Sequence, residues 1–340
     1  QALNIAHVYN SVEALLTHPG LQVVHNCTPN HLHAQINRQI LAAGLHVFSE
    51  KPLCMTAEEA RELVALAARA GVVHGVSFVY RQFAMVQQAA SMMRAGQVGR
   101  LFSAHGSYLQ DWMVQQSDYN WRVESALGGA SRAVADIGSH WCDTVQFVTG
   151  RRIVEVMADL AIVWPTRKAC VVAEATFSEH RHDTQYQDVP VTTEDAGSVL
   201  FRFDDGSKGC FSVSQVSAGR KNHLSFEING SHCSLHWDQE TPQQLWVGHR
   251  QQANQILTDD PGLMNADVAA NAHFPGGHIE GWPDAFKNMM LNFYQAVRAG
   301  EMPAENARRF ASFSEGANVM YIIDAIVKSH LQRRWVSVEQ

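Results

Sequence analysis

The stretch His46-Val47-Phe48-Ser49-Glu50-Lys51-Pro52 is a short β-type run that ends in a lysine followed by a proline. Thr56 and Glu59 come next with the Thr-x-x-Glu spacing of a capping box, which predicts the start of a helix. Open α/β sheets bind their ligands at the carboxyl ends of the strands, where Lys51 would lie. Pro52 favours an extended conformation for Lys51. An amine held there could bind a hydroxyl group or move a proton, and the alternative is an ordinary surface lysine.

Residues 1–99 alternate between helical and strand-like segments. Strands are predicted at 21–27, 46–49 and 72–78, and helices at 11–17, 31–43, 56–70 and 83–95. Repeated βα units of this length predict a parallel, Rossmann-type sheet with right-handed crossovers.

A dinucleotide-binding sheet normally opens with a strand, a Gly-x-Gly-x-x-Gly turn and a helix. That motif does not occur in the sequence. Since a leading βαβ unit takes about 30 residues or more, we expect the sequence to lack the start of the natural protein. The alternative is a smaller sheet that never contained a phosphate-binding turn.

After Gly99 the pattern changes to one rich in strands. Strands are predicted at 101–108 and 153–163, and two hairpins around the turns at 204–207 and 229–232. These predict an α+β domain with a large open, mostly antiparallel sheet of about five or six strands, followed by helices at 282–299 and 307–329. We expect two domains, residues 1–99 and 100–340, with a partner subunit covering the open sheet.

Composition excludes several other classes of protein. The net charge is −7 and no run is rich in lysine or arginine, which argues against a nucleic-acid partner. No apolar stretch reaches the roughly 18–20 residues of a membrane span. The six cysteines are far apart and form no Cys-x-x-Cys pair, which favours free thiols in the cytoplasm.

A second group of residues lies in the run from Gly128 to Asp143. If this run is helical from about Val134, then Asp136, His140 and Asp143 share one face. A carboxylate one turn from an imidazole can orient it as a general base. The alternatives are a solvated polar helix face and a metal site, and no third metal ligand is evident.

A third group, Cys27-Thr28-Pro29-Asn30-His31-Leu32-His33, lies between a predicted strand and a predicted helix. Helix N-termini favour polar or anionic ligand groups, and Asn30 or His31 could also cap the helix. Further along, the segments 110–112 and 119–122 combine aromatic and polar side chains that suit a sugar ring. For Trp112 and Trp121 the alternative is packing in the core or at an interface.

Together these motifs resemble the glucose–fructose oxidoreductase/inositol dehydrogenase (Gfo/Idh/MocA) family over essentially the whole chain. The resemblance lies in four motifs in the family's order: Thr28-Pro29-Asn30-His31-Leu32-His33, Glu50-Lys51-Pro52, Tyr80-Arg81, and Gly129 through Asp136, Gly138, His140 and Asp143. It implies NAD or NADP bound in the N-terminal domain, a sugar, cyclitol or related polyol as substrate, and a homodimer or homotetramer.

The resemblance also implies roles for individual residues. The catalytic set would be Lys51, Asp136 and His140. Residues near the cofactor would be Cys27, Thr28, Pro29, Asn30, His31, Glu50, Lys51, Pro52 and Arg81. The substrate would meet Lys51, Tyr108, Asp111, Trp112, Trp121, Arg122, Asp136, His140 and His278. The chain departs from the family in lacking the glycine turn and the acidic residue after the second strand, so dinucleotide binding by this chain is expected to be weak or absent.

The resulting hypothesis is reversible hydride transfer between a substrate carbinol carbon and nicotinamide. His140, oriented by Asp136, would take the hydroxyl proton while Lys51 stabilises the developing charge on oxygen. The roles of Lys51 and His140 could be exchanged. No cluster of basic residues indicates a phosphorylated substrate. The rival hypotheses are a non-catalytic regulator that senses a dinucleotide or sugar, and a histidine-rich metal hydrolase.

Overall fold

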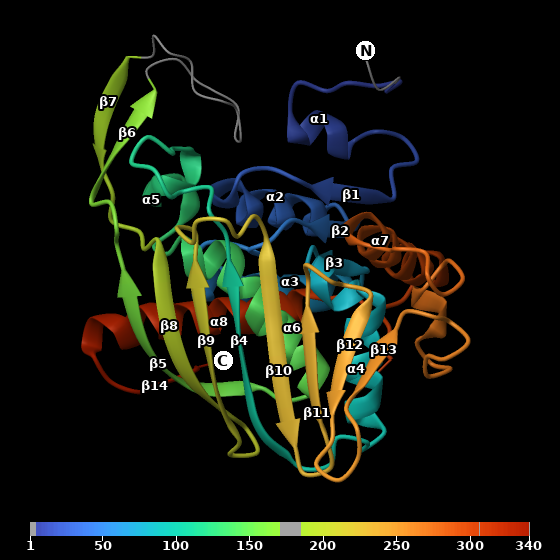
Figure 1. The fold of residues 1–340 in the computed structure, drawn as a ribbon. Coiled ribbons are helices and arrows are strands. Elements are labelled where there is room, and N and C mark those ends of the chain that lie inside the picture. The colour runs from blue at the N-terminus through green and yellow to red at the C-terminus, as the bar shows by residue number, and fades with distance from the viewer. Residues whose placement is uncertain (1–4, 171–184, 306, 340) are drawn as a thin grey trace.

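The computed structural model describes residues 5–170, 185–305 and 307–339. Within these residues the chain forms a three-stranded parallel sheet, a nine-stranded sheet and a two-stranded ribbon. In Figure 1 the small sheet lies at the top and the large sheet faces the viewer. The predicted combination of a Rossmann-type sheet with a large, mostly antiparallel sheet is therefore confirmed.

The small sheet has the order β1-β2-β3 and consists of β1 (Val23–Asn26), β2 (His46–Ser49) and β3 (His74–Val76). Its helices are α1 (Val12–Leu16), α2 (Asn30–Ala42), α3 (Ala57–Ala70) and α4 (Ala84–Arg94), with a 3₁₀ turn at Val79–Gln82. Thr56 caps α3 by accepting a hydrogen bond from the Glu59 amide. The Glu59 carboxylate accepts a hydrogen bond from the Met55 amide, whereas a capping box would use the amide of Thr56.

The large sheet has the order β13-β12-β11-β10-β4-β9-β8-β5-β14. Its strands are β4 (Leu101–Leu109), β5 (Ile153–Ala161), β8 (Ala196–Phe203), β9 (Lys208–Ser214), β10 (His223–Gly230), β11 (Ser234–Asp238), β12 (Gln244–Gly248), β13 (Gln255–Thr258) and β14 (Val336–Ser337). Both predicted hairpins are present, as β8–β9 and β10–β11. The prediction of five or six strands was too low, because β12, β13 and β14 lack a strong alternating pattern. The pairing of β4 with β9 is parallel.

Helices cover one face of the large sheet and leave the other open (Figure 1). Behind the sheet lie α4, α6 (Ser139–Thr149) and α8 (Phe313–Gln332). On the open face, Met157 of β5 stands opposite Leu200 of β8, and both side chains are exposed. The neighbouring pair, Val156 of β5 and Phe201 of β8, points to the face covered by helices, and both side chains are almost completely buried. The sheet therefore has one packed face and one face with exposed apolar side chains.

The C-terminal segment returns to the small sheet. Helix α7 spans Trp282–Ala299, as predicted, and α8 packs against α3. The Val76 amide of β3 donates to the carbonyl of Ala311. Helix α8 begins later than predicted because Ser312 and Glu315 form the capping box that starts it. No helix within the described ranges is long and apolar enough to cross a membrane.

The remaining elements are short. They are α5 (Ser125–Gly128), 3₁₀ turns at Trp121–Val123 and Ala269–Asn271, a π-helical turn at Val134–Gly138, and the ribbon of β6 (Thr166–Cys170) with β7 (Tyr186–Pro190). The ribbon was not predicted, and its strands flank the segment 171–184 that the structure does not describe. The predicted continuous helix from Val134 instead begins with the π-helical turn and continues as α6.

Candidate active site

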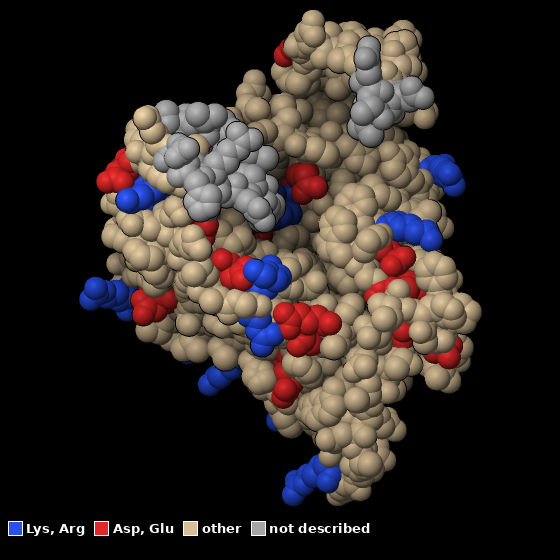
Figure 2. Space-filling model, turned by 45° about the horizontal axis from the view of Figure 1, so that its top comes forward, with Lys and Arg blue, Asp and Glu red and all other residues tan. Residues whose placement is uncertain are grey.

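Lys51 and Asp136 meet where the small sheet faces the second half of the chain. Lys51 follows β2, and Asp136 lies on the π-helical turn. The Lys51 ammonium donates to Asp136 Oδ1 at 2.7 Å and to the Asp136 main-chain carbonyl at 2.8 Å. Each side chain is 17% exposed. Figure 2 shows this side of the molecule hollowed, with acidic and basic side chains interspersed around the hollow.

Asp136 is held as a carboxylate. Burial raises its pKa, but the positive charges of Lys51 and Arg122 lower it more strongly, to about 2. Arg122 Nε lies 3.8 Å from Oδ1. The second oxygen, Oδ2, accepts a hydrogen bond of 2.9 Å from the side-chain amide of Gln215. Sequence reasoning missed Gln215, because nothing in the local sequence after β9 distinguishes it from a solvent-exposed glutamine.

His140 is buried among aromatic rings one turn after Asp136. Its ring centroid lies 5.0 Å from that of Tyr80 and 5.7 Å from that of Phe78. Its Nδ1 has no hydrogen-bond partner. Burial and then the charge of Lys51 hold the pKa of His140 well below its usual value, so the imidazole is neutral at physiological pH. The Asp136 carboxylate binds Lys51 and Gln215. That Asp136 orients His140 stays a prediction.

Asp143 and Arg81 form a separate buried ion pair. Arg81 Nε donates to Asp143 Oδ2 at 2.9 Å, and its guanidinium lies over the Phe147 ring. Burial raises the pKa of Asp143. Asp143 thus lies on the same helix as His140, but its carboxylate binds buried Arg81. The guanidinium of Arg81 is thus paired with Asp143, and its place beside the cofactor stays a prediction.

The loop after β1 is tied to the Lys51 loop and to the second half of the chain. His33 contacts the Thr28 carbonyl at 2.6 Å and the Pro52 carbonyl at 2.7 Å. Asn30 donates to the Gly128 carbonyl. Neither Asn30 nor His31 caps α2: the N-cap position is Pro29, so Asn30 is already helical and His31 is exposed.

The ends of β1 and β2 fit the nicotinamide side of a dinucleotide. Cys27 and Thr28 follow β1, and Glu50, Lys51 and Pro52 follow β2, so all reach the same edge of the sheet. The Glu50 amide donates to the Asn26 carbonyl at 2.9 Å, so the two loops lie side by side. In the described part of the chain no glycine-rich turn accompanies them. The residues present therefore fit one end of the cofactor.

Four of the six remaining predicted substrate residues make contacts with neighbouring side chains. Tyr108 is buried in a hydroxyl network with Tyr80 at 2.6 Å and Asn222 at 2.7 Å. Asp111 accepts from Lys221, and Arg122 lies over the Trp121 ring at 4.5 Å.

The other two predicted substrate residues have different settings. Trp112 donates to Gln110 at 2.6 Å and packs beside a small apolar cluster around buried Met113. His278 is exposed, in a loop where its ring contacts the Pro275 carbonyl. The contacts of His278 do not join it to Lys51 or Asp136.

One group of described residues has the spacing of metal ligands. It consists of His223, Asp238 and Glu240. Arg220 already pairs with Glu240 at 2.5 Å. None of the three was among the predicted catalytic residues.

Two family models match the chain in sequence order. The model described as an oxidoreductase family with an NAD-binding Rossmann fold matches residues 1–78, and the GFO/IDH/MocA C-terminal domain matches residues 86–236. The chain belongs to the GFO/IDH/MocA family of oxidoreductases. The predictions of this family and of an NAD(P)-dependent oxidoreductase are therefore confirmed.

Relatives of this GFO/IDH/MocA chain include sugar and cyclitol dehydrogenases. Levoglucosan dehydrogenase of Pseudarthrobacter phenanthrenivorans is 29% identical over 96% of this chain and 82% of its own length. A levoglucosan dehydrogenase solved with NADH and levoglucosan superposes with a TM-score of 0.85 at 27% identity, covering 98% of this chain and 84% of that one. An inositol dehydrogenase homologue from Azotobacter vinelandii, solved with NAD⁺, gives 0.81 at 27% identity, covering 96% and 81%.

Proposed function

We propose that the protein transfers a hydride between nicotinamide and a hydroxyl-bearing carbon of an unphosphorylated sugar, cyclitol or related polyol. The observation that carries this proposal is the Lys51–Asp136 ion pair beside a neutral, buried His140. These groups lie at the sheet edge where Thr28 and Glu50 fit the nicotinamide side of the cofactor. The bound cofactor would supply the hydride acceptor or donor.

In this mechanism the proton goes to His140. A neutral imidazole can accept the hydroxyl proton as the hydride leaves. Lys51 would donate a hydrogen bond to the same oxygen and stabilise its developing negative charge. Asp136 would keep Lys51 charged and aimed. The described geometry thus favours Lys51 as stabiliser and His140 as base over the exchanged assignment, because the Lys51 ammonium already donates to Asp136 Oδ1 and to the Asp136 carbonyl.

The substrate class follows from the side chains around the pair and from the relatives. Trp121 and Trp112 offer ring faces, while Asp111 and Arg122 offer hydrogen-bonding groups, a combination that suits a sugar. Arg122 is already drawn toward Asp136, so it does not provide a free phosphate site. Two of the relatives named above are levoglucosan dehydrogenases, one of them solved with NADH and levoglucosan, and the third is an inositol dehydrogenase homologue solved with NAD⁺. For this chain we propose a pyranose, anhydrosugar or cyclitol.

We also propose that the protein is a homo-oligomer in the cytoplasm, built from units 1–99 and 100–340. The exposed Met157, Leu200 and Ile256 on the open sheet support self-association. The six free cysteines support a reducing compartment. Sedimentation of the wild type beside a Leu200→Lys variant tests the interface, since a charge in a covered apolar face should shift the protein toward monomer.

The test of function is a panel of sugars and polyols with NAD and NADP. The protein is expressed from its complete reading frame, and reduced nicotinamide is followed by absorbance. Lys51→Ala and His140→Ala should each lower kcat by roughly 10²–10⁴-fold while NADH binding, followed by fluorescence, stays close to that of wild type.

Lys287→Ala, an exposed lysine on α7, is the matched control and should leave kcat unchanged. Binding of NADH without turnover of any substrate would instead support the regulatory role. Full activity in both Lys51→Ala and His140→Ala would refute the assignment.

A further inference from the structure

Gln215 bridges Asp136 and a buried arginine. Its side-chain nitrogen Nε2 donates to Asp136 Oδ2 at 2.9 Å, and its side-chain oxygen Oε1 accepts from Arg132 Nη1 at 2.8 Å. The sense of the amide is fixed by chemistry, because an arginine can only donate and a carboxylate can only accept. The side chain is therefore held at both ends, and its donor is directed at the carboxylate that holds Lys51.

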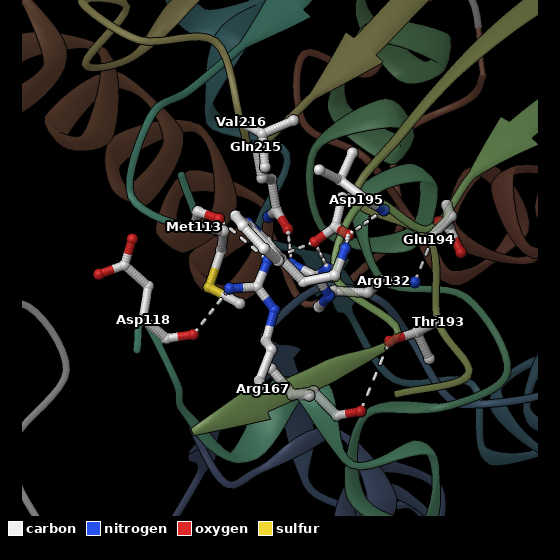
Figure 3. Close-up of polar contacts among 12 residues, drawn as sticks. Met113, Asp118, Arg132, Arg167, Thr193, Glu194, Asp195, Gln215 and Val216 are labelled. Atoms are coloured by element: carbon white, nitrogen blue, oxygen red, sulfur yellow. Dashed lines mark hydrogen bonds and ion pairs between the residues drawn. The ribbon is translucent and has the colours of Figure 1, made fainter. Parts of the chain in front are cut away.

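Arg132 belongs to an ion cluster that is completely buried. Figure 3 shows Arg132 and Arg167 converging on the carboxylate of Asp195. All three side chains are 0% exposed. Asp195 Oδ2 accepts from the amides of Val163 and Trp164. Gln215 is tied to the same place through its backbone, since its amide donates to the Asp195 carbonyl.

The cluster also fixes the loop that carries the proposed sugar-facing residues. Arg167 Nη1 donates to the carbonyls of Gln115 and Asp118, and Nη2 donates to the carbonyl of Met113, each at 2.9 Å. The Met113 amide in turn donates to the Gln215 carbonyl. One network therefore joins the segment after Asp111 to the hydrogen bond on Asp136.

The neighbouring Glu194 holds the turn on which Asp136 lies. Its carboxylate accepts from the Arg132 and Val134 amides at 3.0 and 2.9 Å, and from the Ser131 hydroxyl at 2.8 Å. The main chain at Asp136 is thus set by Glu194, while its side chain is set by Lys51 on one oxygen and Gln215 on the other.

The cluster is not arranged for stability alone. Arg132 Nε and Arg167 Nε are buried without hydrogen-bond partners, which is costly. A buried ion cluster is often no more stable than apolar packing of the same volume. What the cluster does provide is polarisation: an arginine on the amide oxygen strengthens the bond that the amide nitrogen donates to Asp136.

We propose that Gln215, held by Arg132, is a positioning residue for the reaction: it fixes the Asp136 carboxylate so that Asp136 aims Lys51 at the substrate oxygen. This inference rests on the proposed dehydrogenase function and names a residue of that site that does not touch the reacting atoms. Its loss should lower kcat more than it raises KM, because the misaligned lysine stabilises the transition state less than before.

The test compares Gln215→Leu with Gln215→Glu in the full-reading-frame protein. The leucine removes the donor and should lower kcat roughly 10-fold to 100-fold at every pH, the effect of about one well-placed hydrogen bond. The glutamate keeps the contact with Arg132 but sets a second carboxylate against Asp136. Two carboxylates at this distance share a proton when the pH is low enough. The Glu variant should therefore regain kcat, relative to wild type, as pH falls from about 8 to about 5.5.

Gln88→Leu is the matched control, since Gln88 is also a buried glutamine but accepts a bond from the Asn265 amide in another part of the molecule. Its kcat should equal that of wild type. A kcat within about twofold of wild type in both Gln215 variants would overturn the inference. So would equal, pH-independent losses accompanied by a lower Tm, which a purely structural role predicts. A wild-type protein that binds NADH but turns over no substrate would refute the proposed function instead, and this inference with it.

Discussion

Replacing Lys51 with methionine removes the main charge that stabilises ionised Asp136 and keeps an unbranched side chain of similar length. Burial raises the pKa of Asp136, but Lys51 and then Arg122 lower it, with a result of about 2 against an ordinary 3.8. A depression of nearly two pKa units corresponds to about 2 kcal/mol at neutral pH. Lys51 makes the largest lowering contribution, so Lys51→Met should lower the unfolding free energy by up to about 2 kcal/mol at pH 7.

The pH dependence of that loss has a definite sign. Because the folded-state pKa of Asp136 lies below its unfolded value, the ionised carboxylate stabilises the folded state above about pH 4. This stabilisation disappears as the pH falls through about 2. The difference in unfolding free energy between wild type and Lys51→Met should therefore shrink as the pH is lowered from about 5 to about 3. Urea denaturation followed by tryptophan fluorescence measures it.

A double-mutant cycle isolates the pair. Asp136→Asn and the double variant Lys51→Met/Asp136→Asn complete the cycle, and we expect a coupling energy of about 2 kcal/mol, with the double variant close to the milder single variant. Additivity within about 0.5 kcal/mol would refute the reasoning. So would a loss in Lys51→Met that is the same at pH 3 and pH 7, since then Asp136 would not owe its low pKa to Lys51.

The same site and its surroundings give four further predictions. The pKa of His140 is held well below 6.5. Protonation of His140 should therefore cause no fall in wild-type kcat between about pH 7.5 and 6.5. Any fall in kcat at lower pH that comes from protonation of His140 should be absent in His140→Ala. Tyr108→Phe removes a hydroxyl from a buried network and should cost roughly 1–3 kcal/mol in urea denaturation, whereas Thr56→Ala at the start of α3 should cost about 1 kcal/mol without changing kcat. Treatment with a chelator should leave activity unchanged, because the proposed mechanism uses none of His223, Asp238 and Glu240; loss of activity with EDTA that zinc restores would contradict the hydride-transfer mechanism.

Much of the fold could be predicted because its signals are local. The strand at His46–Ser49 and the helix at Trp282–Ala299 have the predicted bounds, and both hairpins follow from turn residues between alternating strands. The predicted start of α8 was too early, because helix-forming residues also precede its true N-cap, Ser312. Strands β12 to β14 are set by pairing with distant neighbours, so a single-sequence pattern had little to detect.

The candidate site was predictable only as far as its residues lie in motifs. Lys51, Asp136 and His140 could be named because each belongs to a recognisable run. Their partners could not be read from spacing, since a helix from Val134 would put Asp136 and His140 on one face. The π-helical turn changes that arrangement, and Asp136 instead binds a lysine 85 residues earlier in the chain.

The change of partner alters the chemistry that the site supports. A carboxylate bonded to His140 would raise its pKa and hold it as an imidazolium near neutrality. Here the Asp136 carboxylate is bonded to Lys51 instead, and burial and then the charge of Lys51 lower the pKa of His140 more than the charge of Asp136 raises it. The protein thus keeps one permanent donor and one neutral acceptor side by side. That division is what oxidation of an alcohol needs, since the oxygen must lose a proton and be stabilised in the same step. By holding the other carboxylate oxygen, Gln215 would keep Asp136 in the position that secures Lys51.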